Sequence, residues 1–146
     1  MELFIDADGC PVTDIAIRLA SKYGCPCTLL CDTAHQLERP GARTITVSKG
    51  ADSVDFALVN LVRPGDLVVT QDYGLAAMCL SRGAVPIHQN GMVYTDENID
   101  GLLFFRAAAK KIRNAGGRLK GPSKRTGEQD HAFARTLEGL LLEAAP

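Results

Sequence analysis

Tryptophan is absent from this chain, and the other aromatic residues are scarce. Aromatic residues make up 5% of the sequence, whereas hydrophobic residues make up 46%. We therefore expect a core built from Leu, Val, Ile and Ala rather than from large rings. A length of 146 residues is enough to bury such a core in one globular domain.

The sequence also lacks a long apolar run and a secretory leader. No stretch reaches the roughly 18 apolar residues that a membrane-spanning helix needs. The opening residues, MELFIDAD, have no basic segment followed by an apolar one, so we expect no signal peptide. These absences predict a cytoplasmic protein without a membrane anchor.

The cysteine pattern does not suit a framework of disulfide bonds, because five cysteines at irregular spacings form an odd set. Cys25, Cys27 and Cys31 share one face of a predicted strand, which leaves a metal site as the alternative. The spacing C-x-C-x3-C is not a usual one for zinc. We expect reduced thiols that are buried for structural reasons.

A net charge of −1 hides a strong asymmetry along the chain. Residues 101–127 contain eight of the 16 basic residues and none of the 17 acidic ones. The remaining residues therefore carry a net charge of −9. This basic segment predicts an anionic partner, with a solvated helix end and loop as the alternative.

Segments of strand and helix character alternate along the sequence. Apolar or β-branched runs predict strands at residues 2–6, 26–31, 43–47, 67–70 and 84–88, with a short additional strand at 91–95. Helical spacing of apolar residues predicts helices at 12–23, 51–62, 73–82, 96–114 and from 127 onward. The alternation predicts an α/β fold with a mainly parallel sheet, covered by helices on both faces, in a single domain over residues 1–146.

Aspartates follow two of the predicted strands. Asp6 ends the first strand and Asp8 comes two residues later, while Asp72 follows strand 67–70. Parallel sheets bind ligands beyond the carboxyl ends of their strands, so these side chains should share one edge. Asp55 lies on the face of helix 51–62 that should point toward the core, and Asp52 lies on a similar face.

Carboxylates gathered in this way repel one another unless a cation is present. Their hard oxygen atoms favour Mg²⁺ or Mn²⁺ over Zn²⁺, and such a site suits hydrolysis of phosphodiester bonds. Helix capping is the alternative for Asp6, Asp8, Asp52 and Asp72. For Asp55 the alternative is a surface position, if the helix is rotated by one residue.

Three stretches of the sequence resemble the YaiI/YqxD family of uncharacterised bacterial proteins. They are FIDADGCPV, GADSVDFALVNLVRPGDLVVTQDYGLAA and RLKGPSKRTGEQDHAFARTLEGLL, and the resemblance runs nearly end to end. That family looks like a branch of the PIN-like nuclease superfamily, whose members cleave RNA with Mg²⁺ or Mn²⁺. The resemblance thus implies a PIN-like three-layer α/β/α domain.

The resemblance also assigns roles to individual residues. Asp6 matches the first aspartate of PIN domains and Asp72 the one after the fourth strand. Asp55 takes the place of the helix carboxylate, where PIN domains often have Glu. The last acidic residue of PIN domains has no secure match. Asp8, Asp52 or Asp130 could substitute for it, which leaves the number of metal ions open.

A basic loop precedes the last predicted helix. Thr126 and Gln129 form a capping-box pattern there, and the first backbone N–H groups of a helix attract phosphate. We expect phosphate or nucleic-acid contacts from this region, and the candidate residues are Arg118, Lys120, Ser123, Lys124, Arg125 and Thr126.

Three functions follow from these patterns. The first is a metal-dependent nuclease that acts on RNA or another phosphate-containing substrate, with Asp6, Asp8, Asp55 and Asp72 as catalytic residues and Asp6, Asp52, Asp55 and Asp72 as metal ligands. The second is a phosphatase of the haloacid dehalogenase type that uses Asp6 and Asp8. The third is a non-catalytic RNA-binding module. The sequence leaves the oligomeric state open.

Overall fold

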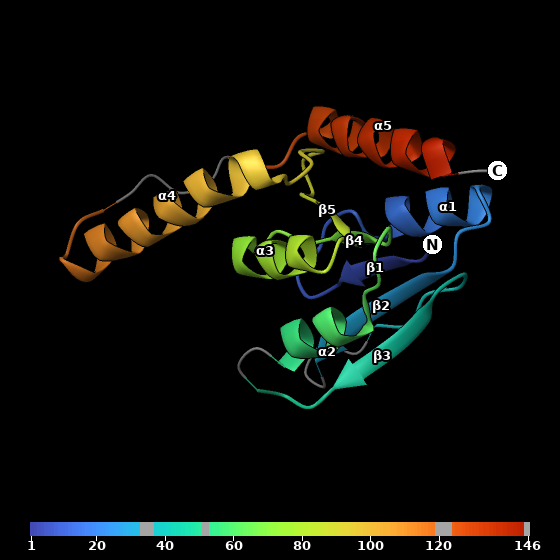
Figure 1. Ribbon diagram of the computed structural model, residues 1–146, viewed down its shortest axis with the longest axis horizontal. Helices are drawn as coiled ribbons and strands as arrows, with labels where there is room; N and C mark the ends of the chain where they lie inside the picture. Colours follow the sequence, from blue (N-terminus) through green and yellow to red (C-terminus); the bar gives the residue numbers. More distant parts are fainter. Residues whose placement is uncertain (33–36, 51–52, 119–123, 145–146) are drawn as a thin grey trace.

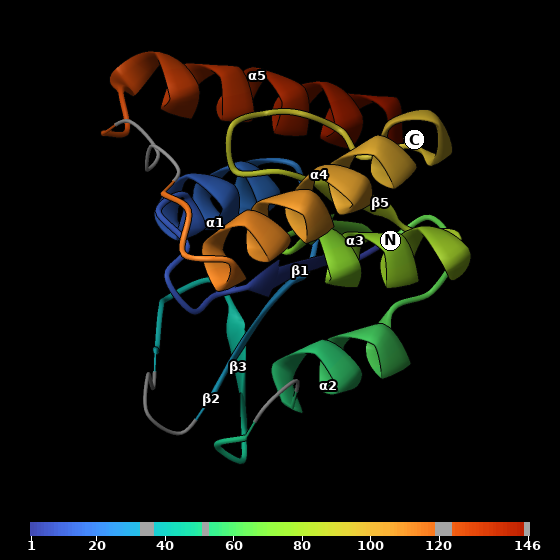
Figure 2. The ribbon, with the colours of Figure 1, turned by 90° about the vertical axis from the view of Figure 1, so that its left-hand side faces the viewer.

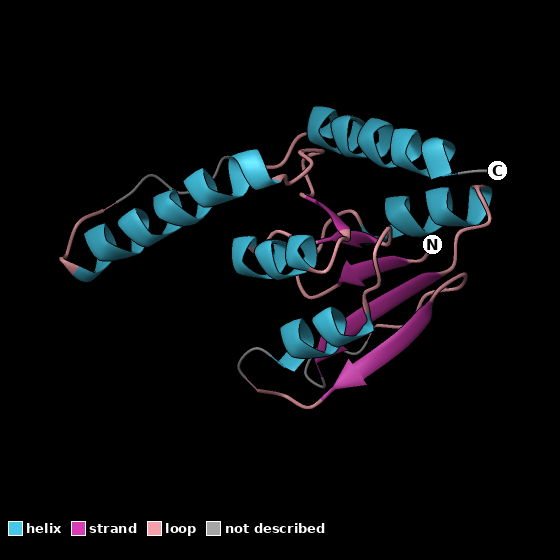
Figure 3. Cartoon of the chain, in the orientation of Figure 1, coloured by secondary structure: helices cyan, strands magenta, loops and turns pink. Residues whose placement is uncertain are grey.

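The computed structural model describes residues 1–32, 37–50, 53–118 and 124–144. Strands and helices alternate through most of this part of the chain (Figures 1 and 3). In chain order they are β1 (Leu3–Asp6), α1 (Thr13–Lys22), β2 (Cys27–Asp32), β3 (Arg43–Val47), α2 (Ser53–Leu61), β4 (Leu67–Val69), α3 (Tyr73–Ser81), β5 (Val85–Ile87), α4 (Asp96–Asn114) and α5 (Gly127–Ala144). Asp52, Lys120 and Ser123 lie outside the described residues.

The five strands form one sheet in the order β3-β2-β1-β4-β5, and each neighbouring pair is parallel. This confirms the predicted α/β fold. Pro86 lies in β5 at the edge of the sheet, where a missing backbone N–H is tolerated. The additional strand predicted at 91–95 is reduced to a single antiparallel bridge between Ile87 and Val93, because the chain turns at Gly91 and then enters α4.

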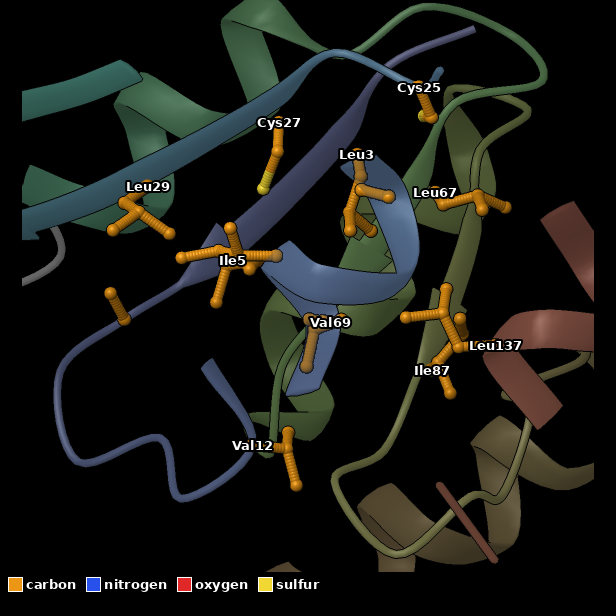
Figure 4. Close-up of a cluster of buried hydrophobic side chains, with 14 of the residues drawn as sticks. Leu3, Ile5, Val12, Cys25, Cys27, Leu29, Leu67, Val69, Ile87 and Leu137 are labelled. Carbon is orange, nitrogen blue, oxygen red and sulfur yellow. The ribbon is translucent and has the colours of Figure 1, made fainter. Parts of the chain in front are cut away.

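Helices cover both faces of the sheet (Figure 2). Leu3 and Ile5 of β1 point to one face, where they pack with α1 and α5 (Figure 4). Phe4, the residue between them, points to the other face and packs with α2 and α3. Side chains alternate along a strand, so this short segment anchors both cores. The result is the expected three-layer arrangement.

Helix α4 differs from the others because it packs on α3 rather than on the sheet. Ile99 of α4 lies with Ala76 and Tyr94 in a separate small core. Thr95 caps the helix through a reciprocal capping box with Asn98. The far half of α4 extends past α3 and away from the sheet (Figure 1).

All five cysteines are free thiols, as predicted. Cys25, Cys27 and Cys31 are buried in the same core, and Figure 4 labels the first two. Burial, with smaller contributions from the nearby Cys25 and Glu2, raises the pKa of Cys27 to about 12. Such a thiol is a structural residue at neutral pH. Among the described helices, none is long and apolar enough to cross a membrane.

Candidate functional site

Asp6 and Asp72 meet at the carboxyl edge of the sheet because β1 and β4 are paired neighbours. Thr70 joins them: its hydroxyl donates to Oδ2 of Asp6 at 2.9 Å and accepts the backbone N–H of Asp72 at 3.0 Å. The Tyr94 hydroxyl in turn donates to the Thr70 carbonyl at 3.1 Å, from a side chain that is fully buried. The two aspartates are therefore held by a rigid, buried threonine.

Negative charge is concentrated around Asp6. Burial raises the pKa of Asp6, the Thr70 hydrogen bond lowers it, and the charges of Asp8 and Asp72 raise it, which together give a pKa of about 6. Burial, with a smaller contribution from the two neighbouring carboxylates, therefore disfavours the ionised form of Asp6. A proton or a metal cation would relieve that imbalance.

Asp8 lies in the turn that follows β1. The backbone N–H of Cys10 donates to the carbonyl of Ala7 at 3.2 Å, and Gly9 takes a positive φ of 68° that favours glycine. The backbone N–H of Asp32, at the end of β2, donates to Oδ2 of Asp8 at 3.2 Å. The alternative prediction, that Asp6 or Asp8 caps α1, is wrong. The N-cap residue of α1 is Val12, and no side chain caps this helix.

Asp72 is the N-cap of α3, as the capping alternative predicted. Its Oδ1 accepts the backbone N–H groups of Gly74 at 2.8 Å and Leu75 at 3.1 Å. The same oxygen also accepts a hydrogen bond from Nη1 of Arg106 at 3.3 Å. All of these contacts use Oδ1, so capping does not prevent Oδ2 from binding another group. The pair is partly exposed, 57% for Arg106 and 41% for Asp72, so it contributes about 0–1 kcal/mol and can be exchanged.

Asp55 reaches the same region from α2. The sequence left open whether Asp55 faces the core or the surface. In the structure it is half-buried, which lies between the two, whereas Leu58 of the same helix is buried in the core. Asp55 and Asp72 line one cleft of about 350 Å³ with Arg106 and Phe56. The pKa of Cys79 is raised to about 12, mainly by burial and further by the charges of Asp55 and Asp6. Both carboxylates therefore lie near that thiol.

The described residues contain no group of three or more His, Cys, Asp or Glu side chains arranged to hold a metal ion. Mg²⁺ does not need such a cage, because it usually binds one or two carboxylates and completes its shell with water and substrate phosphate. The donor set fits a cation of this kind: hard oxygen atoms with an excess of negative charge at Asp6. The thiol-metal alternative for the cysteines gains no support in the same part of the chain.

The basic segment is divided between solvent and internal contacts. Arg118, Lys124 and Thr126 are exposed. Arg125 is bound within the protein: Nε donates to Asp130 at 2.8 Å, Nη1 to the side chain of Asn90 at 2.7 Å and Nη2 to the Gln89 carbonyl at 2.7 Å. Asp130, one candidate for the missing acidic residue, is thus the partner of this guanidinium. Phosphate binding by these residues stays a prediction.

Sequence reasoning missed two residues of the site. Arg106 lies on the same face of α4 as the apolar residues Ile99, Leu102 and Leu103. A charged residue on an apolar helix face was the sequence signal that could have identified it. Thr70 was recognised only as the end of a strand. Its role depends on the pairing of β1 with β4, which no local pattern specifies.

Comparison with known proteins gives a consistent result. The model of the "Uncharacterized BCR, YaiI/YqxD family" matches residues 4–143. A UPF0178 protein of Exiguobacterium sibiricum is 56% identical over 143 residues, covering 98% of each chain. Others from Ruminiclostridium cellulolyticum (51%; 94% of this chain and 90% of the relative) and Clostridium acetobutylicum (48%; 97% of each) are similar. No solved structure matches the chain.

Proposed function

The chain belongs to the uncharacterised YaiI/YqxD family of bacterial proteins, and we propose that it is a metal-dependent hydrolase of phosphodiester bonds, with RNA as the substrate. One observation carries the proposal. Asp6 and Asp72 are joined through Thr70 at the carboxyl edge of the sheet, and burial, with smaller contributions from the charges of Asp8 and Asp72, raises the pKa of Asp6 to about 6. A fixed pair of carboxylates of this kind is suited to a divalent cation, which can in turn bind a phosphate.

Asp6 and Oδ2 of Asp72 would hold Mg²⁺ or Mn²⁺, with water and substrate phosphate completing its shell. Asp8 and Asp55 are further carboxylates near this pair. When bound, such a cation activates water and neutralises charge on the scissile phosphate. The Thr70 hydroxyl donates to Oδ2 of Asp6, so it orients this carboxylate and directs Oδ1 toward a ligand. Asp6 carries its proton up to about pH 6 and must release it for ligand binding.

Arg106 supplies a second positive charge at the same place. Its guanidinium lies 3.3 Å from Asp72 and lines the cleft with Asp55. A guanidinium binds phosphate oxygens with two parallel hydrogen bonds, and a partly exposed ion pair gives way easily to such a ligand. Arg106 would therefore exchange Asp72 for the phosphate when the substrate binds.

The test compares RNA cleavage by the parent with Asp6→Asn, Asp72→Asn and Asp100→Asn. Asp100 is an exposed carboxylate on α4 and serves as the control. We expect cleavage that requires Mn²⁺ or Mg²⁺ and falls by about 100-fold or more in the first two variants, because each removes a charge from the site. Cleavage that survives both substitutions would refute the proposal.

Two further measurements distinguish the alternative functions. Phosphorylated Asp6, trapped and detected by mass spectrometry, would favour the phosphatase instead. RNA binding without Mn²⁺ affinity in calorimetry would favour a non-catalytic RNA-binding module.

A further inference from the structure

The far half of α4 exposes aromatic side chains. Phe104 is 77% exposed and Phe105 is 69% exposed, and Ile112 on the same helix is 44% exposed. Ile99 and Ala109 are the buried residues of α4, so the phenyl rings do not contribute to the core. Two adjacent exposed rings are costly to keep in water, which points to a binding surface.

The same part of α4 is strongly basic. We call residues 104–114 the α4 arm. Its charged residues are all basic and all exposed: Arg106, Lys110, Lys111 and Arg113. A partner must therefore be anionic and must also present flat apolar surfaces to the phenyl rings. Unpaired nucleotides have both properties, because phosphates alternate with bases that stack on aromatic rings.

The position of the arm relative to the carboxylates favours a nucleic acid over other anionic partners. Arg106 belongs to the arm and contacts Asp72, so the arm begins at the candidate site. From there α4 extends past α3 and away from the sheet (Figure 1). A strand whose phosphate lies at the carboxylates would therefore continue along this helix.

We propose that the α4 arm binds a single-stranded segment of nucleic acid, with Phe104 and Phe105 stacking on bases and Lys110, Lys111 and Arg113 contacting phosphates. The inference deepens the proposed hydrolase function and rests on it for the identity of the bound strand. Two arms of the same charge repel each other, which argues against pairing of this helix with its equivalent in a second copy.

The first experiment uses the absence of tryptophan from the chain. Phe104→Trp introduces a single indole that reports directly on stacking. The probe is an oligouridylate of about 12 nucleotides, within the range of single-strand binding sites, in EDTA so that hydrolysis cannot occur. We expect quenching of the indole fluorescence and an affinity close to that of the parent. Binding of the probe without quenching would contradict stacking at this position.

The second experiment separates stacking from general apolar contact. Phe104→Leu and Phe105→Leu keep apolar bulk but remove the rings, and each should weaken oligouridylate binding about tenfold. Leu142→Ala on α5 is the control, because Leu142 is 55% exposed and lies outside the arm. Unchanged affinity in both leucine variants, with unchanged circular dichroism, would overturn the proposal.

The third experiment tests the charges. Lys110→Gln and Arg113→Gln should each reduce the slope of log affinity against log salt by about one unit, because each removes one phosphate contact. Arg135→Gln on α5 is the matched control, since Arg135 is also exposed. An equal change in all three variants would mean that net charge alone governs binding, which contradicts an arm-specific site.

Other occupants and other failures give distinct results. Light scattering that shows a dimer in the parent and a monomer in Phe104→Leu would assign the arm to a second copy. Binding to anionic vesicles that is stronger than oligouridylate binding would assign it to a membrane surface. Either result overturns the proposal. Asp6→Asn should bind the probe in EDTA like the parent, so loss of cleavage with retained binding would count only against the hydrolase.

Discussion

Asp6 is a proposed metal ligand and also has a strongly raised pKa. It ends a central strand, accepts a hydrogen bond from Thr70 and lies within the field of two other carboxylates. Its pKa of about 6 exceeds the ordinary aspartate value of 3.8, so the folded protein holds a proton at Asp6 more tightly than the unfolded chain does. The stabilisation from this proton is therefore complete below about pH 4 and is lost as the pH rises through about 6.

The first prediction concerns Asp6→Asn in metal-free buffer. The amide has no ionised form, so the variant should gain stability relative to the parent as the pH rises from 4.5 to 7.5, in the ~2-unit window set by the raised pKa. Thermal unfolding at the two pH values measures this change. Mn²⁺ at pH 7.5 should raise the Tm of the parent and not that of the variant. Equal pH dependence in both proteins would mean that Asp6 is not perturbed.

Asp66 provides a second prediction at the residue scale. It is 6% exposed and accepts the backbone N–H groups of Glu2 and Arg63, each at 2.9 Å. Asp66→Ala leaves both donors without an acceptor and should lower the free energy of unfolding by about 2–4 kcal/mol. Urea denaturation measures the loss, and Asp100→Ala is the exposed control. A loss below about 0.5 kcal/mol would mean that water replaces the carboxylate.

At the scale of the helices, α3 shows how one carboxylate can have two roles. Oδ1 of Asp72 caps the helix, while Oδ2 is proposed as a metal ligand. Substitution can separate these roles because serine also caps helices but has no carboxylate. Asp72→Ser should keep the stability of the parent, whereas Asp72→Ala should lose about 1 kcal/mol.

Mn²⁺ binding completes this third prediction. Both Asp72 variants should lose affinity for the ion in calorimetry, because both lack the second oxygen. If Asp72→Ser bound Mn²⁺ as the parent does, Asp72 would be a cap and nothing more. Unfolding and metal titration of the same two variants therefore determine which role the residue has.

Most helices and strands could be predicted from the sequence, because apolar periodicity and capping signals are local. The long helix was predicted to begin after a cap at Thr95 or Asp96 and to end at about Asn114, and the structure has Thr95 as the cap and Asn114 as the last residue. The short strand expected at 91–95 pairs only through one bridge to Ile87, because a local pattern does not specify how many residues find a partner. The extension of α4 from the body was also beyond prediction, since it depends on tertiary packing against α3.

At the scale of the whole molecule, Arg125 joins the N-terminal end of α5 to the loop after β5. Its three hydrogen bonds reach Asp130, Asn90 and Gln89. In the fourth prediction, Arg125→Ala and Arg125→Lys both lose about 1–3 kcal/mol of stability, because lysine cannot reproduce the planar fork. Lys124→Ala, at an exposed neighbour, should change little.

RNA binding by the same variants tests the alternative, that Arg125 binds phosphate. If Arg125 served phosphate instead of the fold, Arg125→Lys would keep both the Tm and most of the RNA affinity. The sequence could place Arg125 in a basic loop, but not reveal that its guanidinium is already bound. Likewise, the sequence placed Asp6 and Asp72 at one edge, because parallel strands share their carboxyl ends. It could not specify the side-chain contacts made there by Thr70 and Arg106.

Helix α5 has a consequence for how the protein is made. Its Phe133, Leu137 and Leu141 are buried in the same core as Leu3 and Ile5. The ribosome releases the first strand long before the last helix, so the part of this sheet face that α5 covers stays exposed until residue 141 has emerged. Such nascent chains aggregate readily and depend on chaperones. Translation that stalls before residue 127 would leave a fragment for proteolysis rather than a folded protein.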